Sequence, residues 1–269
     1  MRVWDLHVHT KHSSCCKQDY DVLDALRAAR ERNCEGIGVT DHSNYARFNA
    51  GFVADQRAAV LRAGEGDRVL VGLEASIVDS RGRLGIHPKF DRLLDYKVIA
   101  EHLHVAKPFS EFHRVKHKIR KWYADPAKHA PRLRRFHAKH RLLYLNALKE
   151  NPGTVLAHPF RFFRSRGLLD PVLLDLAEEV AQQAQESRVA IEVHGKFLAA
   201  ANGEPSSHRE FVLQMFRAFA KYDLKYALGS DAHRLERVGH FPRLEEALRV
   251  LGVPAERVVG GEHFRKRQT

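Results

Sequence analysis

Cysteine is scarce in this chain of 269 residues. Its three cysteines are Cys15, Cys16 and Cys34, an odd set with two adjacent members, which argues against the disulfide framework of a small secreted domain. No apolar run approaches the roughly 20 residues that a membrane-spanning helix needs. No basic and then apolar signal segment precedes the first predicted strand. We therefore expect a cytoplasmic protein that does not enter a membrane.

Two kinds of catalytic motif are also missing. The chain has neither the Gly-x-Ser-x-Gly motif of serine hydrolases nor a P-loop. What it does have is the composition of a soluble globular protein, with 44% hydrophobic and 29% charged residues. Its length fits one large α/β domain, which we expect to span residues 1–269 without internal repeats.

Positive charge is the main bias of the composition, with a formal net charge of +12. Most of it lies between residues 107 and 141, which contain twelve Lys or Arg and only two acidic residues, Glu111 and Asp125. Aromatic residues interleave with these cations, as in surfaces that bind single-stranded nucleic acid by stacking and charge: Phe109, Phe112, Trp122, Tyr123 and Phe136. The alternative is a solvated helix face with Phe136 packed inward. The bias favours a phosphorylated substrate, with nucleotides and single-stranded nucleic acid as candidates.

The same segment predicts two helices. Ser110 can cap a helix that runs to about Tyr123 and is broken at Asp125-Pro126. A second helix is predicted to begin near Pro131 and to end at Asn151, with one apolar face that includes His140. We expect a basic helical insertion over residues 107–150 of the main domain.

Elsewhere, strands and helices alternate along the chain. Strands are predicted at 2–8, 36–40, 69–74, 97–100, 154–157, 189–193 and 226–229, with a last short strand at 258–259. Helices are predicted at 21–34, 52–63, 90–94, 171–187, 206–222 and 244–251. About seven strand–helix units on one chain favour a (β/α) barrel.

Potential metal ligands follow the predicted strands. His7 and His9 alternate along the first strand on the same face as Val3 and Asp5, so both imidazoles project together. Active-site groups of (β/α) barrels lie at the carboxyl ends of the strands, where this chain places His42, Glu74, His102, His158, Asp231 and His233. His194 ends another strand, where it either lines the site or is an ordinary strand-end histidine. Eight such ligands exceed the needs of one tetrahedral zinc, so two or three metals are expected, with Glu74 able to bridge.

These motifs, taken in order, resemble those of the PHP (polymerase and histidinol phosphatase) family: Asp5-Leu6-His7-Val8-His9-Thr10, Thr40-Asp41-His42, Gly72-Leu73-Glu74, Ala100-Glu101-His102, Ala157-His158-Pro159 and Ser230-Asp231-Ala232-His233. The resemblance implies an α/β fold, a distorted (β/α)7 TIM-like barrel, and a site of two or three divalent metal ions, Zn, Mn or Fe. It also implies ligand sets: His7, His9, Glu74 and Asp231 for the first metal, His42 and His233 for the second, and His102 and His158 with bridging Glu74 for the third.

Some assignments stay open. Family members often place an Asp or His a few residues beyond the His-x-His pair, where this chain offers His12 or Cys15 as a further ligand for the second metal. His104 replaces His102 if the register slips by two. Cys34 fits core packing better than ligation.

Other residues near the ligands are candidates for catalysis and substrate binding. Asp5 and Asp41 lie beside ligands and can orient imidazoles, or Asp41 can serve a turn; Asp41 and His194 are the candidate catalytic residues. The loop after His158 offers Arg161, Arg164 and Arg166, of which Arg161 is the best candidate for a phosphate clamp. Lys107 and Lys196 are further candidates for substrate binding.

The sequence therefore predicts a metal-dependent phosphoesterase in which a hydroxide activated by the metals attacks phosphorus in line. Alternatives are a phosphatase for a small metabolite such as histidinol phosphate, an amidohydrolase-like hydrolase, and a nucleic-acid-binding module with structural metals.

Overall fold

The computed structural model describes residues 2–43, 51–86, 88–102, 113, 117–165, 167–168, 170–203 and 208–265. Several predicted features lie outside these residues: Lys107, His104, Arg166, Phe109, Phe112 and the start of the helix predicted at Ser110. Within the described part of the chain, no helix combines the length and the apolar character needed to cross a membrane.

Parallel strands form two ladders. One has the order β1 (Trp4–Val8), β2 (Gly36–Val39), β3 (Val69–Val71). The other has the order β4 (Leu73–Ser76), β5 (Lys97–Ala100), β6 (Val155–Ala157), β7 (Ala190–His194), β8 (Tyr226–Gly229), β9 (Val258–Val259). The strand predicted at 69–74 is thus two strands, because the pairing changes at Gly72.

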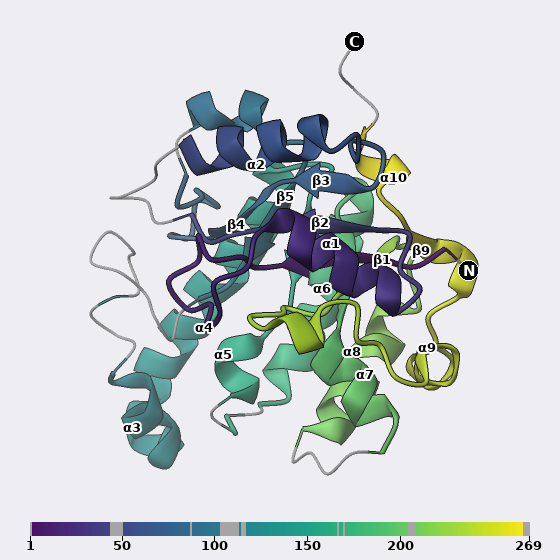
Figure 1. The fold of residues 1–269 in the computed structure, drawn as a ribbon. Helices are drawn as coiled ribbons and strands as arrows, with labels where there is room; N and C mark the ends of the chain where they lie inside the picture. Colours follow the sequence, from purple (N-terminus) through teal and green to yellow (C-terminus); the bar gives the residue numbers. More distant parts are fainter. Residues whose placement is uncertain are drawn as a thin grey trace.

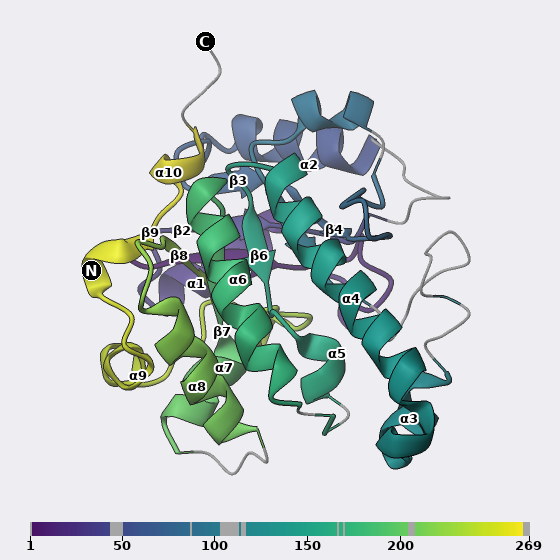
Figure 2. The ribbon, with the colours of Figure 1, turned by 180° about the vertical axis from the view of Figure 1, so that it is seen from behind.

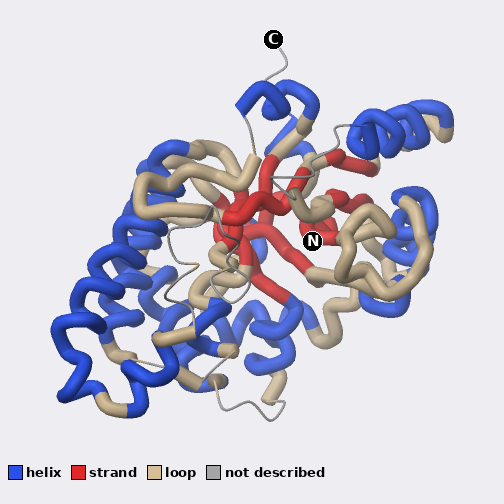
Figure 3. The backbone as a smooth tube through the Cα atoms, turned by 90° about the vertical axis from the view of Figure 1, so that its left-hand side faces the viewer, coloured by secondary structure: helices blue, strands red, loops and turns tan. Residues whose placement is uncertain are grey.

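Backbone contacts join the two ladders at both seams. A bridge between His42 and Glu74 links the end of β2 to β4. At the other seam, a bridge pairs Val8 with Ala232, and the His9 N–H donates to the Ala232 carbonyl at 3.0 Å. With β3 and β4 as one position and β9 outside, seven strand positions surround the centre, and helices surround the strands (Figure 3). This arrangement confirms the predicted TIM-like barrel.

The helices lie outside the strands and follow them in the chain (Figure 1). The first, α1, begins with a capping box in which Asp21 accepts from the Asp24 N–H at 3.0 Å. On the side seen in Figure 2, α4 packs beside α6, and α6 beside α8. The helices are α1 (Val22–Glu31), α2 (Gly51–Arg62), η2 (Pro88–Leu93), α3 (Ile119–Ala124), α4 (Pro126–Glu150), α5 (Arg161–Arg164), α6 (Val172–Glu186), α7 (Gly195–Ala201), α8 (Arg209–Phe219), η4 (Leu235–Arg237), α9 (Leu244–Leu251), η5 (Ala255–Arg257) and α10 (Glu262–Arg265).

The insertion differs from the prediction at two boundaries. Of the helix predicted from Ser110 to about Tyr123, α3 forms only from Ile119, and His117 and Lys118 before it lie in a turn. Helix α4 begins at Pro126 rather than near Pro131, which lies inside it. Asp125 caps this start by accepting from the Lys128 N–H at 3.2 Å, and proline suits the first helical position, so the break predicted at Asp125-Pro126 is also the start of the next helix. The short helices α5 and α7, which follow β6 and β7, were not predicted.

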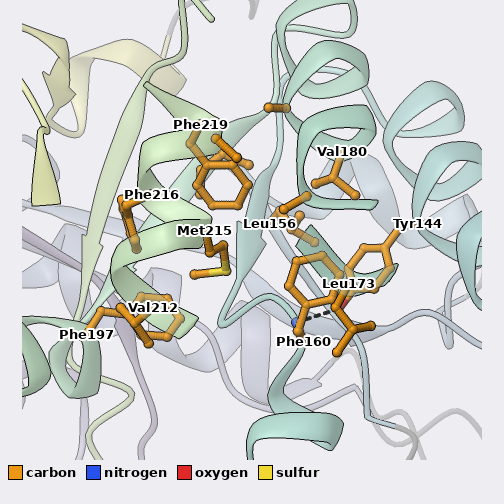
Figure 4. Close-up of a cluster of buried hydrophobic side chains, with 14 of the residues drawn as sticks. Tyr144, Leu156, Phe160, Leu173, Val180, Phe197, Val212, Met215, Phe216 and Phe219 are labelled. Carbon is orange, nitrogen blue, oxygen red and sulfur yellow. Dashed lines mark hydrogen bonds between the residues drawn. The ribbon is translucent and has the colours of Figure 1, made fainter. Parts of the chain in front are cut away.

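Helix α4 packs its apolar face on the largest buried cluster of the protein. This cluster lies between the strands and helices α4, α6 and α8, and Figure 4 shows aromatic rings in it, with the Phe160 N–H donating to the Tyr144 hydroxyl at 2.8 Å. Trp122 and Phe136 are buried in the same cluster. Burying each large apolar side chain contributes about 1.5–3 kcal/mol, so these aromatics serve packing and do not form an exposed stacking surface.

Candidate metal centre

A β-bulge in β1 directs both histidines of the opening motif into the barrel. Asp5 pairs with Ile37 and Val8 with Val39, so β1 has one residue more than β2 across this interval. Leu6 packs inside the barrel and Val8 packs outward with α1, and the extra residue returns His7 to the inner face that His9 also occupies.

The bulge turns Asp5 away from the histidines. Its carboxylate accepts the backbone N–H of Ser230 at 2.9 Å and of Gly239 at 2.7 Å. The prediction that Asp5 shares a face with His7 and His9 is therefore wrong, because simple strand alternation does not cross a bulge. Asp5 fastens the end of β8 to β1 and orients no imidazole among the described residues.

All eight predicted ligands converge at the carboxyl ends of the strands. His9 Nε2 lies 3.2 Å from His7 Nε2 and 3.1 Å from Asp231 Oδ1. Glu74 lies at the centre, with Oε1 2.9 Å from His158 Nε2 and 3.2 Å from His102 Nε2. Their ligand atoms form four overlapping groups within 4.8 Å: His7, His9 and Asp231; His7, Glu74 and His158; His42, Glu74 and His102; His9, His42 and His233.

Hydrogen bonds on the far side of two rings fix where their protons are. His7 Nδ1 lies 2.6 Å from a carboxylate oxygen of Glu192, which can only accept, so Nδ1 carries the proton. The Ser13 hydroxyl donates to Asp41 at 2.6 Å and therefore accepts from His9 Nδ1 at 3.0 Å. In the neutral rings, Nε2 of His7 and of His9 is then an unprotonated acceptor that points into the site.

Four potential ligand atoms thus face one another once both rings are neutral. They are Nε2 of His7 and His9, Oδ1 of Asp231, and Oε2 of Glu74, which lies 3.6 and 3.5 Å from the two imidazole nitrogens. Glu74 Oε2 is buried, and His42 Nδ1 approaches it to 2.8 Å without the geometry of a hydrogen bond. Such a set of nitrogen and oxygen donors fits a divalent cation.

The pKa shifts express the same negative potential. Burial alone would lower the pKa of His7, but the Glu192 and Glu74 carboxylates raise it well above its usual value. Burial would raise the pKa of Glu74, but the imidazoles of His102, His42 and His7 hold it well below its usual range. Protons and metal cations compete for such ligands, so a site that attracts one attracts the other.

Glu192 is the functional residue that the sequence analysis missed. Besides contacting His7, its second oxygen accepts the backbone N–H of His158 at 2.6 Å, where the His158 backbone adopts a positive φ of 29°. Glu192 lies on the inner face of β7, within a run of buried apolar residues. A lone acid inside an otherwise apolar strand was the available signal.

A sulfur atom lies beside the histidines predicted for the second metal. His233 Nε2 lies 2.9 Å from Cys15 Sγ, and His42 Nδ1 lies 2.8 Å from Glu74 Oε2. Burial would raise the pKa of the Cys15 thiol, but hydrogen bonds and charge from His233 and His42 outweigh burial and lower that pKa to about 6. A thiol with such a pKa is readily deprotonated, which is the state in which a cysteine can bind a metal. Cys34 is buried among apolar residues, as predicted.

The two candidate catalytic residues have different surroundings. The Asp41 carboxylate accepts from Thr10, Ser13 and Gln56, so it holds the loop after His9 and does not face the acceptor cluster. His194 Nδ1 accepts the Lys196 N–H at 2.9 Å, which places the ring proton on Nε2, 3.3 Å from Asp231 Oδ2. His194 therefore offers an N–H at the edge of the cluster.

The predicted cations differ in position. Arg161 lies at the site, with one guanidinium nitrogen 3.2 Å from Asp231 Oδ2 and 3.3 Å from His158 Nε2. Lys196 is exposed as a whole residue. Partial desolvation of its amine and the charge of Arg161 lower the pKa of that amine. Arg164 turns inward over the Phe197 ring, 4.5 Å from its centroid. Lys107 lies outside the described residues, as does His104, whereas His102 contacts Ser76 Oγ at 2.8 Å.

The sequence and the fold are similar to those of known proteins. The sequence matches the PHP domain over residues 5–226. It is 23% identical over 267 residues to a probable phosphatase of Clostridium botulinum, covering 96% of this chain and 90% of that protein. The fold is similar to that of histidinol phosphate phosphatase from Lactococcus lactis, solved with zinc, L-histidinol and phosphate, with a TM-score of 0.57, 12% identity and 93% of each chain covered. A putative histidinol phosphatase from Listeria monocytogenes follows, with a TM-score of 0.53, 12% identity, and 88% of this chain and 97% of that chain covered. The chain belongs to the PHP domain family.

Proposed function

We propose that the protein is a metal-dependent phosphoesterase whose metals are held by the eight converging ligands. The observation that carries the proposal is the meeting of His7 Nε2, His9 Nε2, Asp231 and Glu74, whose potential ligand atoms lie close together at the ends of the strands. Divalent cations bound there would activate water for attack on phosphorus and neutralise the charge of the phosphate oxygens. Two or three ions, of Zn, Mn or Fe, suit the number and the chemistry of the ligands.

The chain's own residues would bind and orient the ester. Arg161 lies beside Asp231 and His158, where its planar guanidinium can bind two phosphate oxygens. His194 holds a proton on Nε2 next to Asp231, and can donate a hydrogen bond to the ester or a proton to the departing alkoxide oxygen. Ser13 and Glu192 keep the rings of His9 and His7 in their binding tautomers.

The substrate class has two candidates. A small phosphomonoester is supported by relatives named probable phosphatases and by the neighbour solved with histidinol and phosphate. A nucleotide or nucleic acid is supported by the exposed cations of the basic insertion: Lys118, Arg120, Lys121, Lys128, Arg132, Arg134, Arg135 and Lys139. Phe136 of α4 packs against Phe162 and Phe163 of α5, which follows His158, so the basic helix borders the site.

The test is hydrolysis of p-nitrophenyl phosphate and bis(p-nitrophenyl) phosphate by chelator-stripped protein reloaded with Mn, Zn or Fe, with metal counted in the same samples. We expect turnover with two or three metals bound. His9→Ala should lose both the turnover and the bound metal. The matched control is His117→Ala, at an exposed histidine of the insertion. Bound metal without turnover of either ester would instead favour a module with structural metals.

A further inference from the structure

We propose that Cys15 is a thiolate ligand of the second metal position, together with His42 and His233. This inference rests on the proposed metal-dependent function and deepens it, because it assigns the metal preference of that position.

The loop after His9 holds Cys15 in place. The Ser13 N–H donates to the Thr10 carbonyl at 3.0 Å and the Cys16 N–H to the Ser13 carbonyl at 2.9 Å, so the loop makes a tight turn around Cys15. The Lys17 N–H then donates to the His233 carbonyl at 3.3 Å, which ties the loop to the end of β8. The turn brings Cys15 Sγ to 2.9 Å from His233 Nε2.

The proton arrangement of His233 makes this contact a pair of metal donors. His233 Nδ1 lies 2.8 Å from the carbonyl oxygen of Asp231, which can only accept, so Nδ1 carries the proton of the neutral ring. Nε2 is then unprotonated and points at Cys15 Sγ. An unprotonated imidazole nitrogen beside a sulfur offers a cation two donor atoms of the kinds that zinc binds.

His42 supplies the third donor, and His12 is excluded. His42 belongs with His233 and His9 to a group whose ligand atoms lie within 4.8 Å of one another, and Cys15 adjoins this group through its contact with His233. The His12 ring stacks on Phe52 instead, with centroids 5.1 Å apart and planes 18° from parallel. Of the two residues offered by this loop, Cys15 is the one that faces the cluster.

A thiolate at this position changes the choice of metal. Sulfur ligands favour zinc and cobalt over manganese, which prefers oxygen. The Cys15 thiol must lose its proton to solvent when the metal binds, so each sulfur–metal bond formed replaces one S–H bond. The other metal positions carry only imidazole and carboxylate donors among the described residues. We therefore expect the second position to discriminate against manganese most strongly.

The experiment is cobalt(II) titration of the metal-stripped full chain, followed by near-ultraviolet absorption and metal counting. The wild type should develop a sulfur-to-cobalt charge-transfer band. Cys15→Ser should lack the band and bind one metal with at least roughly a hundredfold weaker affinity, since losing even a partner of a ligand costs ten- to a hundredfold. The matched control is Cys16→Ser, because Cys16 Sγ donates to the backbone carbonyls of Gln18 and His233 and packs against the buried cluster beside α1.

A second readout does not depend on the variant folding. Zinc should protect Cys15 of the wild type from alkylation by iodoacetamide, read by peptide mass spectrometry, and should leave Cys16 reactive. A cobalt-loaded, ester-hydrolysing protein without the band, or with the band intact in Cys15→Ser, would overturn the Cys15 assignment and leave the proposed function standing. A chain that binds no metal in any variant would overturn both.

Discussion

The Glu192 carboxylate joins two of the clustered histidines by different means. One oxygen lies 2.6 Å from His7 Nδ1, and the other accepts the backbone N–H of His158 at 2.6 Å. A single buried acid of β7 thus fixes the ring of a histidine from β1 and the backbone of a histidine that follows β6.

Replacing Glu192 should therefore weaken metal binding without removing a ligand. Glu192→Gln removes the charge that favours the Nδ1 proton of His7, and loss of such a partner typically costs about ten- to a hundredfold in metal affinity. The measurement is calorimetric metal titration, with exposed Glu245→Gln as the control. Equal affinities of the two variants would show that His7 needs no carboxylate partner.

Ser13 should matter for the same reason at His9. In Ser13→Ala, His9 Nδ1 loses its acceptor and the link to Asp41 is broken, so the ring is free to adopt the other tautomer. We expect roughly tenfold weaker metal binding, by the same principle. Ser14→Ala is the matched control, since Ser14 is the next residue and its side chain is exposed. A parallel loss in both variants would indicate a loop effect rather than a tautomer effect.

Gly229 should not tolerate a methyl group. A Cβ at this position would lie 2.1 Å from Glu192 Oε1 and 2.8 Å from His7 Cβ, so Gly229→Ala must displace the pair that orients His7. We expect lower metal affinity and a loss of about 1–3 kcal/mol of unfolding free energy, as for overpacked cores. At Gly195, the nearest atom to an added Cβ is 3.7 Å away, so Gly195→Ala is a suitable control. Thermal and urea unfolding of both variants give the comparison.

His140 should make stability depend on pH. It is buried on α4 and stacks on Phe136, and neither ring nitrogen has a hydrogen-bond partner within the described ranges. Burial, with a smaller effect of His137, lowers the pKa of His140 from 6.5 to about 3. Between pH 6.5 and 3, His140 is protonated in the unfolded chain but not in the folded chain. The contribution of His140 to the unfolding free energy is therefore fully present above pH 6.5 and decreases as the pH falls toward 3.

His140→Leu tests this pH dependence, because leucine cannot be protonated. At pH 5 the wild type should have lost about 2 kcal/mol through this group, which is the 1.5-unit interval below the unfolded pKa converted at 1.36 kcal/mol per unit. Between pH 7.5 and pH 5, the unfolding free energy of His140→Leu, measured with urea, should therefore decrease by less than that of the wild type, and the difference should equal this amount. Exposed His117→Gln should follow the wild type. Identical pH profiles of the wild type and His140→Leu would contradict the prediction.

The basic face of α4 offers a test between the two substrate classes. Charge reversal at Arg132, Arg135 and Lys139 removes exposed cations from the half of the helix that borders α5. If the substrate is a nucleic acid, its binding should weaken at least tenfold and depend less on salt, since phosphate contacts dominate such affinities. Turnover of p-nitrophenyl phosphate should not change. Reversal at Arg62 and Arg249, both exposed on other helices, is the control.

Much of the fold could be predicted because its signals are local. The apolar periodicity of α1, α6 and α8, and the short buried runs of β2, β5 and β8, predict a barrel without knowledge of any long-range contact. The insertion was less predictable: α4 begins at Pro126 because Asp125 both ends one helix and caps the next. The short helices α5 and α7 form in loops that carry no repeating apolar pattern.

The sequence by itself determined which donor atoms this protein brings to the ends of its strands, because the carboxyl ends of parallel strands meet at one end of a barrel. Only the tertiary structure decided how those donors are oriented. The bulge in β1 turns Asp5 outward, and Glu192 contacts His7 across a separation of 185 residues. Ring tautomers depend on partners from other strands and loops, and those partners become neighbours only when the barrel closes.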